Sequence, residues 1–224
     1  CRAIEVAEGG DDMVAIAPAL SAARELHARS TFVRRLQEWP LGYPGDFETI
    51  EYILRQDVDG RPGSFEYWIE YLALSSAMAQ QHRNKVRRQA AELKARIATP
   101  DRPANILILA AGGAPDLRSI IHDVADTAFH VVLNDIDQRA LSFAGGKLGP
   151  IADRTIAVPG NAVTNCRKLA ARGPFALVVA GGLMDYLPTK VATRFLTLIW
   201  KRLLGSGGIL FFTNIRTPNP WRIW

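Results

Sequence analysis

Residues that hold metals or form disulfides are scarce in this sequence. Its 224 residues include two cysteines, Cys1 and Cys166, and four histidines. The two cysteines lie far apart, and the histidines do not recur at the short spacings typical of metal ligands. We therefore expect no metal site, and the low cysteine content favours a reduced, cytoplasmic protein.

Long apolar runs are also missing. No stretch of eighteen apolar residues occurs, although apolar residues make up 48% of the chain and charged residues 22%. This composition is ordinary for a soluble globular protein, and we expect no membrane span. The chain opens with Cys1 instead of Met and shows no charged-then-apolar signal segment, which is consistent with a fragment or a trimmed chain.

The net charge is +5, and much of the positive excess lies in one run, Arg83–Arg88. Such a run either attracts an acidic or phosphorylated partner or forms a solvated helix face. Aromatic residues do not interleave it, as they often do in nucleic-acid-binding proteins. We favour the solvated face and expect no nucleic-acid partner.

Helical patterns dominate residues 1–103, which we expect to form an N-terminal helical subdomain. Residues 1–18 are rich in Ala, Gly and Asp and are expected to be loosely ordered, whereas residues 19–39 predict a helix that ends before Pro40. The residues expected near one face of that helix are Leu26, Val33 and Leu36. Ser64 predicts the cap of a further helix. A four-residue stripe predicts another: Val86, Ala90, Leu93 and Ile97.

The pattern changes in residues 104–224, where short apolar runs alternate with helix-like segments. The five runs are residues 105–110, 130–133, 155–158, 175–180 and 208–213. A helical stripe before the fifth run consists of Val191, Phe195, Leu198 and Ile199. Apolar strands that alternate with helices predict a parallel sheet covered on both faces. We therefore expect an α/β, Rossmann-like doubly wound domain in this part of the chain.

In such a sheet, ligands bind at the carboxyl ends of the strands, near the point where the strand order reverses. The first predicted strand runs into a turn of small residues that includes Ala111, Gly112 and Gly113. Small residues let a ligand approach the backbone, and the next helix offers free N–H groups. A plain tight turn is the alternative. The Gly-x-Gly-x-x-Gly pattern of nicotinamide dehydrogenases is missing.

The second and third strands are followed by residues suited to a nucleoside. Asp135 ends the second strand about twenty residues after the glycine turn, where a carboxylate can accept hydrogen bonds from ribose hydroxyls. Asp137 shares this prediction, with helix capping as the alternative. After the third strand, Asn161 and Ala162 could border an adenine through a side-chain amide and a backbone N–H. Asn161 would serve equally well as a helix cap.

The fourth strand runs into two glycines, Gly181 and Gly182, which would place backbone against a reaction cleft. Gly181 is the candidate for contact with a bound cofactor. Asp185 and Tyr186 follow and could orient an acceptor molecule. The alternative is that Asp185 only starts a helix and Tyr186 only packs.

Several segments together resemble class I S-adenosylmethionine (SAM)-dependent methyltransferases, over roughly residues 104–214. They are residues 41–48 (LGYPGDFE), 106–117 (ILILAAGGAPDL), 134–141 (NDIDQRAL) and 180–188 (AGGLMDYLP), with Asn214 and the later Asn219-Pro220. Within that class the chain is similar to the bacterial group for 3-hydroxypalmitate methyl ester biosynthesis.

The resemblance implies SAM as the cofactor. It implies that the Ala111–Ala114 turn lies along the methionine part, that Asp135 holds the ribose and that Asn161-Ala162 borders the adenine. It also implies that the Tyr43–Asp46 segment folds over the cofactor as a lid; core packing and turn formation are the alternatives for Tyr43 and Asp46.

Two features depart from the class. The turn reads Ala-Ala-Gly-Gly-Ala in place of the commoner Gly-x-Gly-x-Gly, and the class usually adds two more strands after the fifth. Because the chain stops at Trp224, we expect either that the C-terminal strands are incomplete, with the tail lost or not included, or that the edge of the sheet is completed differently. The aromatic segment 64–82 would wall an acceptor pocket or form subdomain core, and we favour core. Its aromatic residues are Phe65, Tyr67, Trp68 and Tyr71.

We predict a SAM-dependent methyltransferase that acts on a small-molecule acceptor by O-, carboxyl- or N-methylation, and we leave a homodimer open. The candidate catalytic residues are Tyr43, Asp46, Asp185 and Tyr186, with Asn214 also near the cleft. One alternative is an enzyme that uses the aminocarboxypropyl arm of SAM, by transfer or by cyclisation, and releases methylthioadenosine. Another is a non-catalytic SAM-binding module.

Overall fold

The computed structural model describes residues 13–99 and 103–215. Cys1, Pro100, Asn219-Pro220 and Trp224 lie outside these residues. The contacts divide the chain into two compact units, with the division after His82 and within helix α6 (Ala77–Ile97). This division lies before the boundary at residue 103 expected from the sequence, because the second half of α6 packs on the sheet.

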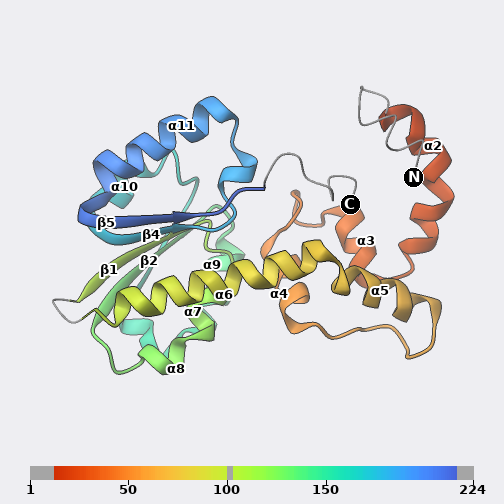
Figure 1. Ribbon diagram of the computed structural model, residues 1–224, viewed down its shortest axis with the longest axis horizontal. Coiled ribbons are helices and arrows are strands. Elements are labelled where there is room, and N and C mark those ends of the chain that lie inside the picture. Colours follow the sequence, from red (N-terminus) through yellow and green to blue (C-terminus); the bar gives the residue numbers. More distant parts are fainter. Residues whose placement is uncertain (1–12, 100–102, 216–224) are drawn as a thin grey trace. The chain divides into compact units, whose positions relative to one another are not determined.

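The N-terminal unit is helical. It contains α2 (Met13–His27), α3 (Thr31–Glu38), α4 (Phe47–Arg55), α5 (Phe65–Ser75) and the beginning of α6 (Figure 1). Three of these helices start at a side chain that accepts a backbone N–H from the first turn: Ser30, Asp46 and Ser64. The small core of the unit consists of Phe32, Ile53, Leu74 and Ala79.

The single helix predicted over residues 19–39 is wrong, since the structure has two helices there. Ser30 interrupts the helix because its hydroxyl accepts the N–H of Val33 at 3.2 Å and so starts α3 anew. The predicted face is also wrong: Leu26 and Leu36 are 44% and 39% exposed, and Phe32 is the buried residue. Residues 13–18, expected to be loosely ordered, belong to α2. The end of α3 before Pro40 and the Ser64 cap are confirmed.

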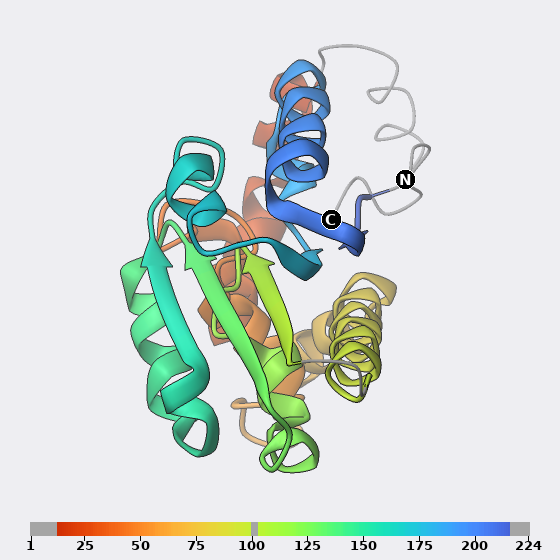
Figure 2. The same ribbon diagram turned by 90° about the vertical axis from the view of Figure 1, so that its left-hand side faces the viewer.

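The C-terminal unit is built on a five-stranded sheet. Its strands are β1 (Ala104–Leu109), β2 (Phe129–Asp135), β3 (Thr155–Pro159), β4 (Phe175–Ala180) and β5 (Leu204–Phe212). They lie in the order β3-β2-β1-β4-β5, and all four neighbouring pairs are parallel (Figure 2). The five predicted strands are confirmed, although β5 begins at Leu204 instead of Gly208.

Helices cover both faces of this sheet. The connecting helices are α7 (Pro115–Ser119), α8 (Ile121–Val124), α9 (Gln138–Lys147), α10 (Cys166–Ala170) and α11 (Thr189–Leu198). Alternate residues of β1 face opposite cores, as the two-residue period of a strand requires. Ile106 and Ile108 belong to the core formed with α6 to α9, whereas Leu107 and Leu109 belong to the core formed with α10 and α11. The predicted doubly wound, Rossmann-like α/β fold is confirmed.

The two helical stripes have different outcomes. All four stripe residues of α6, Val86, Ala90, Leu93 and Ile97, are buried. Near α11, Phe195 and Ile199 are fully buried, but Leu198 is 36% exposed because it is turned away from the Phe195–Ile199 face. Among the described residues, no helix is both long and apolar enough to cross a membrane.

Candidate functional site

The carboxyl ends of the strands bring most of the predicted residues to one edge of the sheet. Because every pair is parallel, the segments that follow β3, β2, β1 and β4 all leave from this edge. Gly112 follows β1, Asp135 ends β2 and Asn161 follows β3, so the three residues lie along three neighbouring strands. The structure therefore places them in the order expected for a ligand that extends across the edge.

The turn after β1 has an alternating backbone conformation. Ala110, Gly112 and Ala114 have φ angles of +49°, +54° and +49°. These are the positions of the three glycines in a Gly-x-Gly-x-Gly turn, because glycine adopts positive φ at low cost. Hydrogen bonds from Ala111 N to Asn134 O (3.0 Å) and from Ala114 N to Ala111 O (2.8 Å) hold this conformation. Two of these three positions are thus held in the left-handed region by alanine.

Asp135 is fixed by two backbone hydrogen bonds. Its Oδ2 accepts the N–H of Gly112 at 2.7 Å, and its Oδ1 accepts the N–H of Asp137 at 2.9 Å. The side chain is buried, and burial raises the pKa of Asp135 while the backbone hydrogen bonds oppose that rise. Because a carboxylate has about four lone-pair sites, each oxygen can still accept a hydrogen bond from a ligand.

Asp137 is engaged locally. It caps α9 by accepting the N–H of Arg139 at 2.9 Å, and it pairs with the Arg139 guanidinium at 3.0 Å. The hydrogen bond from Arg139 lowers the pKa of Asp137. Its capping interpretation is confirmed, and its role in cofactor binding stays a prediction. Between the two acids, Ile136 is 67% exposed, an apolar side chain at the edge that the sequence analysis missed.

The loop after β3 is held by side-chain amides. Asn161 Oδ1 accepts the N–H groups of Val163 (2.9 Å) and Thr164 (3.3 Å) and so closes a turn. The helix-cap alternative is wrong, because the N-cap of α10 is Asn165. Ala162 is buried in the core next to α10. Asn134, fully buried at the end of β2, donates to Val158 O (2.8 Å) and Gly160 O (2.9 Å) and so ties this loop to its neighbour.

The two glycines after β4 accommodate side chains of α6. A Cβ added at Gly181 would overlap the side-chain amide of Gln89, so any other residue there would displace that amide. A Cβ added at Gly182 would lie 3.4 Å from Nζ of Lys85, an ordinary contact. The missing side chain at Gly181 therefore has a packing reason, and its predicted contact with the cofactor stays a prediction.

Lys85 and Asp116 were missed by the sequence analysis. Burial lowers the pKa of Lys85, and the nearby carboxylates of Asp185 and Asp116 oppose that effect. Asp116 is 3% exposed, and burial raises its pKa to about 6. The solvated-face interpretation of the basic run holds for Arg87 and Arg88. It is wrong for Arg83, which is 5% exposed, and for half-buried Lys85, which lies one turn before Gln89 on the side of α6 that faces β4.

Asp185 and Tyr186 lie in a short 3₁₀ turn, Met184–Tyr186. Asp185 is exposed, and its Oδ1 accepts the N–H of Ile215 at 2.7 Å. It does not start α11, which begins at Thr189, and Tyr186 is 51% exposed instead of packed. Asn214 donates only to the neighbouring Ile215 O, at 3.3 Å, among the hydrogen bonds of the described residues. Catalytic roles for these residues stay predictions.

The other predicted catalytic residues belong to the N-terminal unit. Asp46 is 1% exposed, accepts the N–H of Thr49 at 3.0 Å and pairs with Arg35. These contacts give it a structural role as the cap of α4. Tyr43 lies in the preceding turn segment. The predicted lid function of the Tyr43–Asp46 segment stays a prediction.

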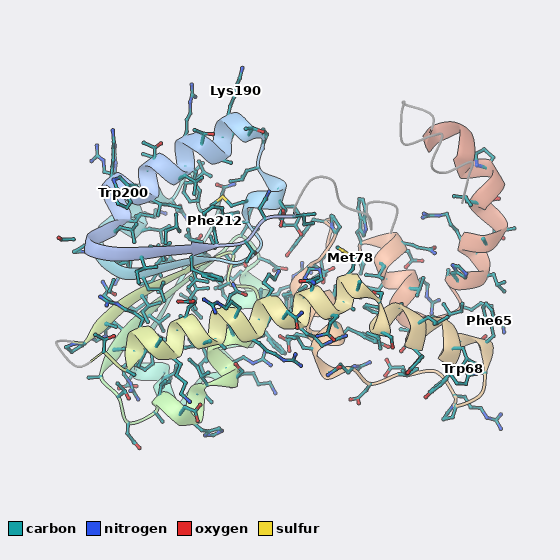
Figure 3. All side chains as sticks on the ribbon, viewed as in Figure 1. Phe65, Trp68, Met78, Lys190, Trp200 and Phe212 are labelled. Atoms are coloured by element: carbon teal, nitrogen blue, oxygen red, sulfur yellow. The ribbon has the colours of Figure 1, made fainter. Side chains whose placement is uncertain are left out.

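The aromatic residues of α5 are largely exposed. Phe65, Trp68 and Tyr71 are 38%, 53% and 46% exposed, so the core interpretation is wrong for them. Figure 3 labels Phe65 and Trp68. The buried side of the helix instead carries Leu74 and Glu70. Glu70 is held in the interior by donors that include Ser30 Oγ at 2.9 Å.

Comparisons with known proteins concern the fold. No family model and no curated protein matches this chain. A possible exported protein from Bordetella parapertussis has a similar crystal structure, with a TM-score of 0.63 at 18% identity over 92% of this chain and 72% of that one. At this identity the likeness shows the fold alone.

Two further structures match less of the chain. A SAM-dependent methyltransferase from Thiobacillus denitrificans, solved with S-adenosylhomocysteine (SAH), has a TM-score of 0.43 at 17% identity over 58% of this chain and 51% of that one. The glycopeptide N-methyltransferase MtfA with SAH has a TM-score of 0.43 at 18% identity over 58% and 52%. This chain thus spans about half the length of these two enzymes.

Among the described residues, no group of three or more side chains could hold a metal ion.

Proposed function

We propose that this protein is a SAM-dependent methyltransferase that acts on a small-molecule acceptor. The observation that carries the proposal is the hydrogen bond between Gly112 N and Asp135 Oδ2, which joins a turn of alternating positive φ to a buried carboxylate. A sheet of this topology binds ligands at this edge. The combination suits an adenosyl group, because the turn admits close approach and the carboxylate accepts hydrogen bonds from ribose hydroxyls.

Neighbouring residues fit the rest of the nucleoside. The exposed side chain of Ile136 offers an apolar surface next to Asp135, on which the flat face of an adenine can pack. The Asn161-Ala162 segment leaves from the adjacent strand β3 and would border the adenine edge. Together, an accepting carboxylate, an apolar side chain and the Asn161-Ala162 segment suit a neutral sugar and base, which supports SAM as the cofactor.

Bound SAM supplies a methyl group that its sulfonium makes electrophilic. The protein must then hold the acceptor in line with that carbon and exclude water. Asp185 and Tyr186, exposed after β4, are the described side chains placed to orient an acceptor. A carboxylate acceptor needs no base, whereas a hydroxyl or amine benefits from one.

The acceptor class is the finer part of the proposal. The resemblance to the group for 3-hydroxypalmitate methyl ester biosynthesis makes long-chain carboxylic acids the first acceptors to test. Hydroxyl and amine acceptors follow, since the site has carboxylates and a tyrosine near the end of β4.

Mass spectrometry of the nucleoside product tests the proposal. The protein is incubated with SAM alone and then with carboxylic acids, hydroxy compounds and amines, with the Asp135→Ala variant as the control. Acceptor-dependent formation of SAH supports methyl transfer. Formation of methylthioadenosine would instead establish chemistry on the aminocarboxypropyl arm, and tight SAM binding without turnover would favour a binding module.

A further inference from the structure

A charged pair lies beside the candidate adenosine site, at the point where the strand order reverses. β1 lies between β2 and β4, and the helices that follow β1 and β4 cover opposite faces of the sheet. Lys85 of α6 and Asp116 of α7 interact electrostatically at this point. Neither residue has a role in the nucleoside contacts proposed above.

The Lys85 ammonium is influenced by two acids but forms an ion pair with neither among the described residues. Its Nζ lies 3.4 Å from the position that a Cβ on Gly182 would occupy, which places it at the carboxyl end of β4. Among the described residues, Lys85 makes no hydrogen bond or ion pair, although Asp116 and Asp185 act on it electrostatically. An ammonium has three donors, and withdrawing it from water without a partner costs free energy.

Asp116 is the complementary group. It is 3% exposed, and among the described residues its carboxylate accepts only backbone N–H groups, with that of Leu117 at 2.9 Å from Oδ1. The positive charges that act on it are those of Lys85 and Arg118, and Arg118 donates to Gly113 O at 3.1 Å. A buried carboxylate normally has a charged partner or several donors. Asp116 and Lys85 are thus a buried acid and a half-buried base that act on each other electrostatically without being bonded to each other.

We propose that Lys85 and Asp116 bind the two charged groups of an α-amino acid: Lys85 the carboxylate and Asp116 the ammonium. The inference rests on the proposed function, because the amino acid would be the methionyl end of SAM. The position agrees with this assignment. Asp135 ends β2, and β1 and β4 are the next two strands, so the pair lies about 5–10 Å further along the edge. A methionyl chain attached to the ribose spans a similar distance.

The electrostatics support this arrangement. Burial raises the pKa of Asp116 and lowers that of Lys85, so the free protein disfavours both charged forms. A zwitterion supplies the opposite charge to each. Asp185 faces Lys85 but is exposed and accepts the N–H of Ile215, which leaves the ammonium available to a ligand.

Calorimetry with two nucleosides tests the inference. SAH contains the amino acid group, whereas methylthioadenosine has the same adenosine and sulfur without it. Lys85→Met and Asp116→Asn are expected to weaken SAH binding about 10- to 100-fold, as the loss of a charged hydrogen bond does, and to change methylthioadenosine binding less than about twofold. Methylthioadenosine binding also reports that each variant is folded. Lys85→Arg, which keeps the charge, should restore part of the SAH affinity.

Arg88→Met is the matched control, because Arg88 lies one turn further along α6 with a side chain that is 68% exposed. It should change neither affinity. Equal losses of SAH and methylthioadenosine in Lys85→Met would overturn the inference, and so would unchanged SAH binding. A raised KM for the acceptor with unchanged SAH affinity would assign Lys85 to the acceptor and also overturn it. If the unaltered protein binds neither nucleoside, the proposed function fails and the inference fails with it.

Discussion

The backbone N–H of Gly112 donates a 2.7 Å hydrogen bond to Oδ2 of Asp135. This bond connects the turn after β1 to the last residue of β2, so the carboxylate positions the turn. The second oxygen of Asp135 accepts the N–H of Asp137 and fixes the plane of the carboxylate. A substitution at Asp135 therefore acts on both strands of the proposed nucleoside site.

The first prediction concerns Asp135. Asp135→Ala should weaken SAH binding by about 1–3 kcal/mol, because a buried charged acceptor is lost and the Gly112 N–H is left without its partner. Asp135→Asn keeps one acceptor oxygen, so its SAH affinity should lie between those of the unaltered protein and Asp135→Ala. Isothermal titration calorimetry measures the change. Asp153→Asn, at a carboxylate that is 79% exposed, is the control, and an Asp135→Ala variant with unchanged affinity would contradict the assignment.

The second prediction concerns Gly181 and Gly182. Gly181→Ala should lower the free energy of unfolding by roughly 1–3 kcal/mol, because the new Cβ overlaps the Gln89 amide. Gly182→Ala, whose Cβ meets Lys85 at 3.4 Å, should cost much less. Urea unfolding of both variants gives the comparison. Adding Gln89→Ala to Gly181→Ala should restore most of the loss; if it does not, the overlap is not the cause.

The third prediction concerns the pH dependence of stability at Asp116. Burial raises its pKa in the folded protein from 3.8 to about 6, so the folded state binds the proton more tightly than the unfolded state does. The contribution of Asp116 to the free energy of unfolding is therefore fully present below pH 4 and is lost as the pH rises through 6. Asp116→Asn removes that loss and should stabilise the protein at pH 7.5 by at most about 3 kcal/mol. Urea unfolding at pH 7.5 and pH 5 should show a smaller gain at the lower pH; an equal gain at both would argue against it.

The fourth prediction concerns two asparagines at opposite ends of the sheet. Asn134→Ala should destabilise the protein by about 2–4 kcal/mol, because the carbonyls of Val158 and Gly160 lose their donor in the interior. Asn105 makes a similar pair of bonds, to Arg172 O (2.8 Å) and Pro174 O (3.1 Å), but in a solvent-exposed position. Asn105→Ala should lower the free energy of unfolding by about 1 kcal/mol or less, since water can donate to these two carbonyls in place of the Asn105 amide. If both variants lost a comparable free energy of unfolding, burial of the asparagine would not determine the size of the loss.

The strands of the sheet and the position of Asp135 were predictable because short stretches of sequence determine them. An apolar run with the right length predicts a buried strand, and Asp135 stands directly at the end of one. Lys85 and Gln89 were not predictable, because a polar residue beside a helical stripe faces either water or a neighbouring strand according to how the helix packs. Ser30 shows a second limit, since its hydroxyl divides a continuous helical pattern in two through one hydrogen bond.

The alanines at positions 110 and 114 have a consequence for the unbound state. Glycine would visit the left-handed conformation and several others, and a ligand would have to select among them. Alanine reaches that conformation only where the surrounding bonds enforce it, at a cost of about 1–2 kcal/mol per residue. The turn therefore has its binding conformation before a ligand binds. A search for the glycine motif in sequences misses such turns, whereas a search for the backbone torsion angles in structures finds them.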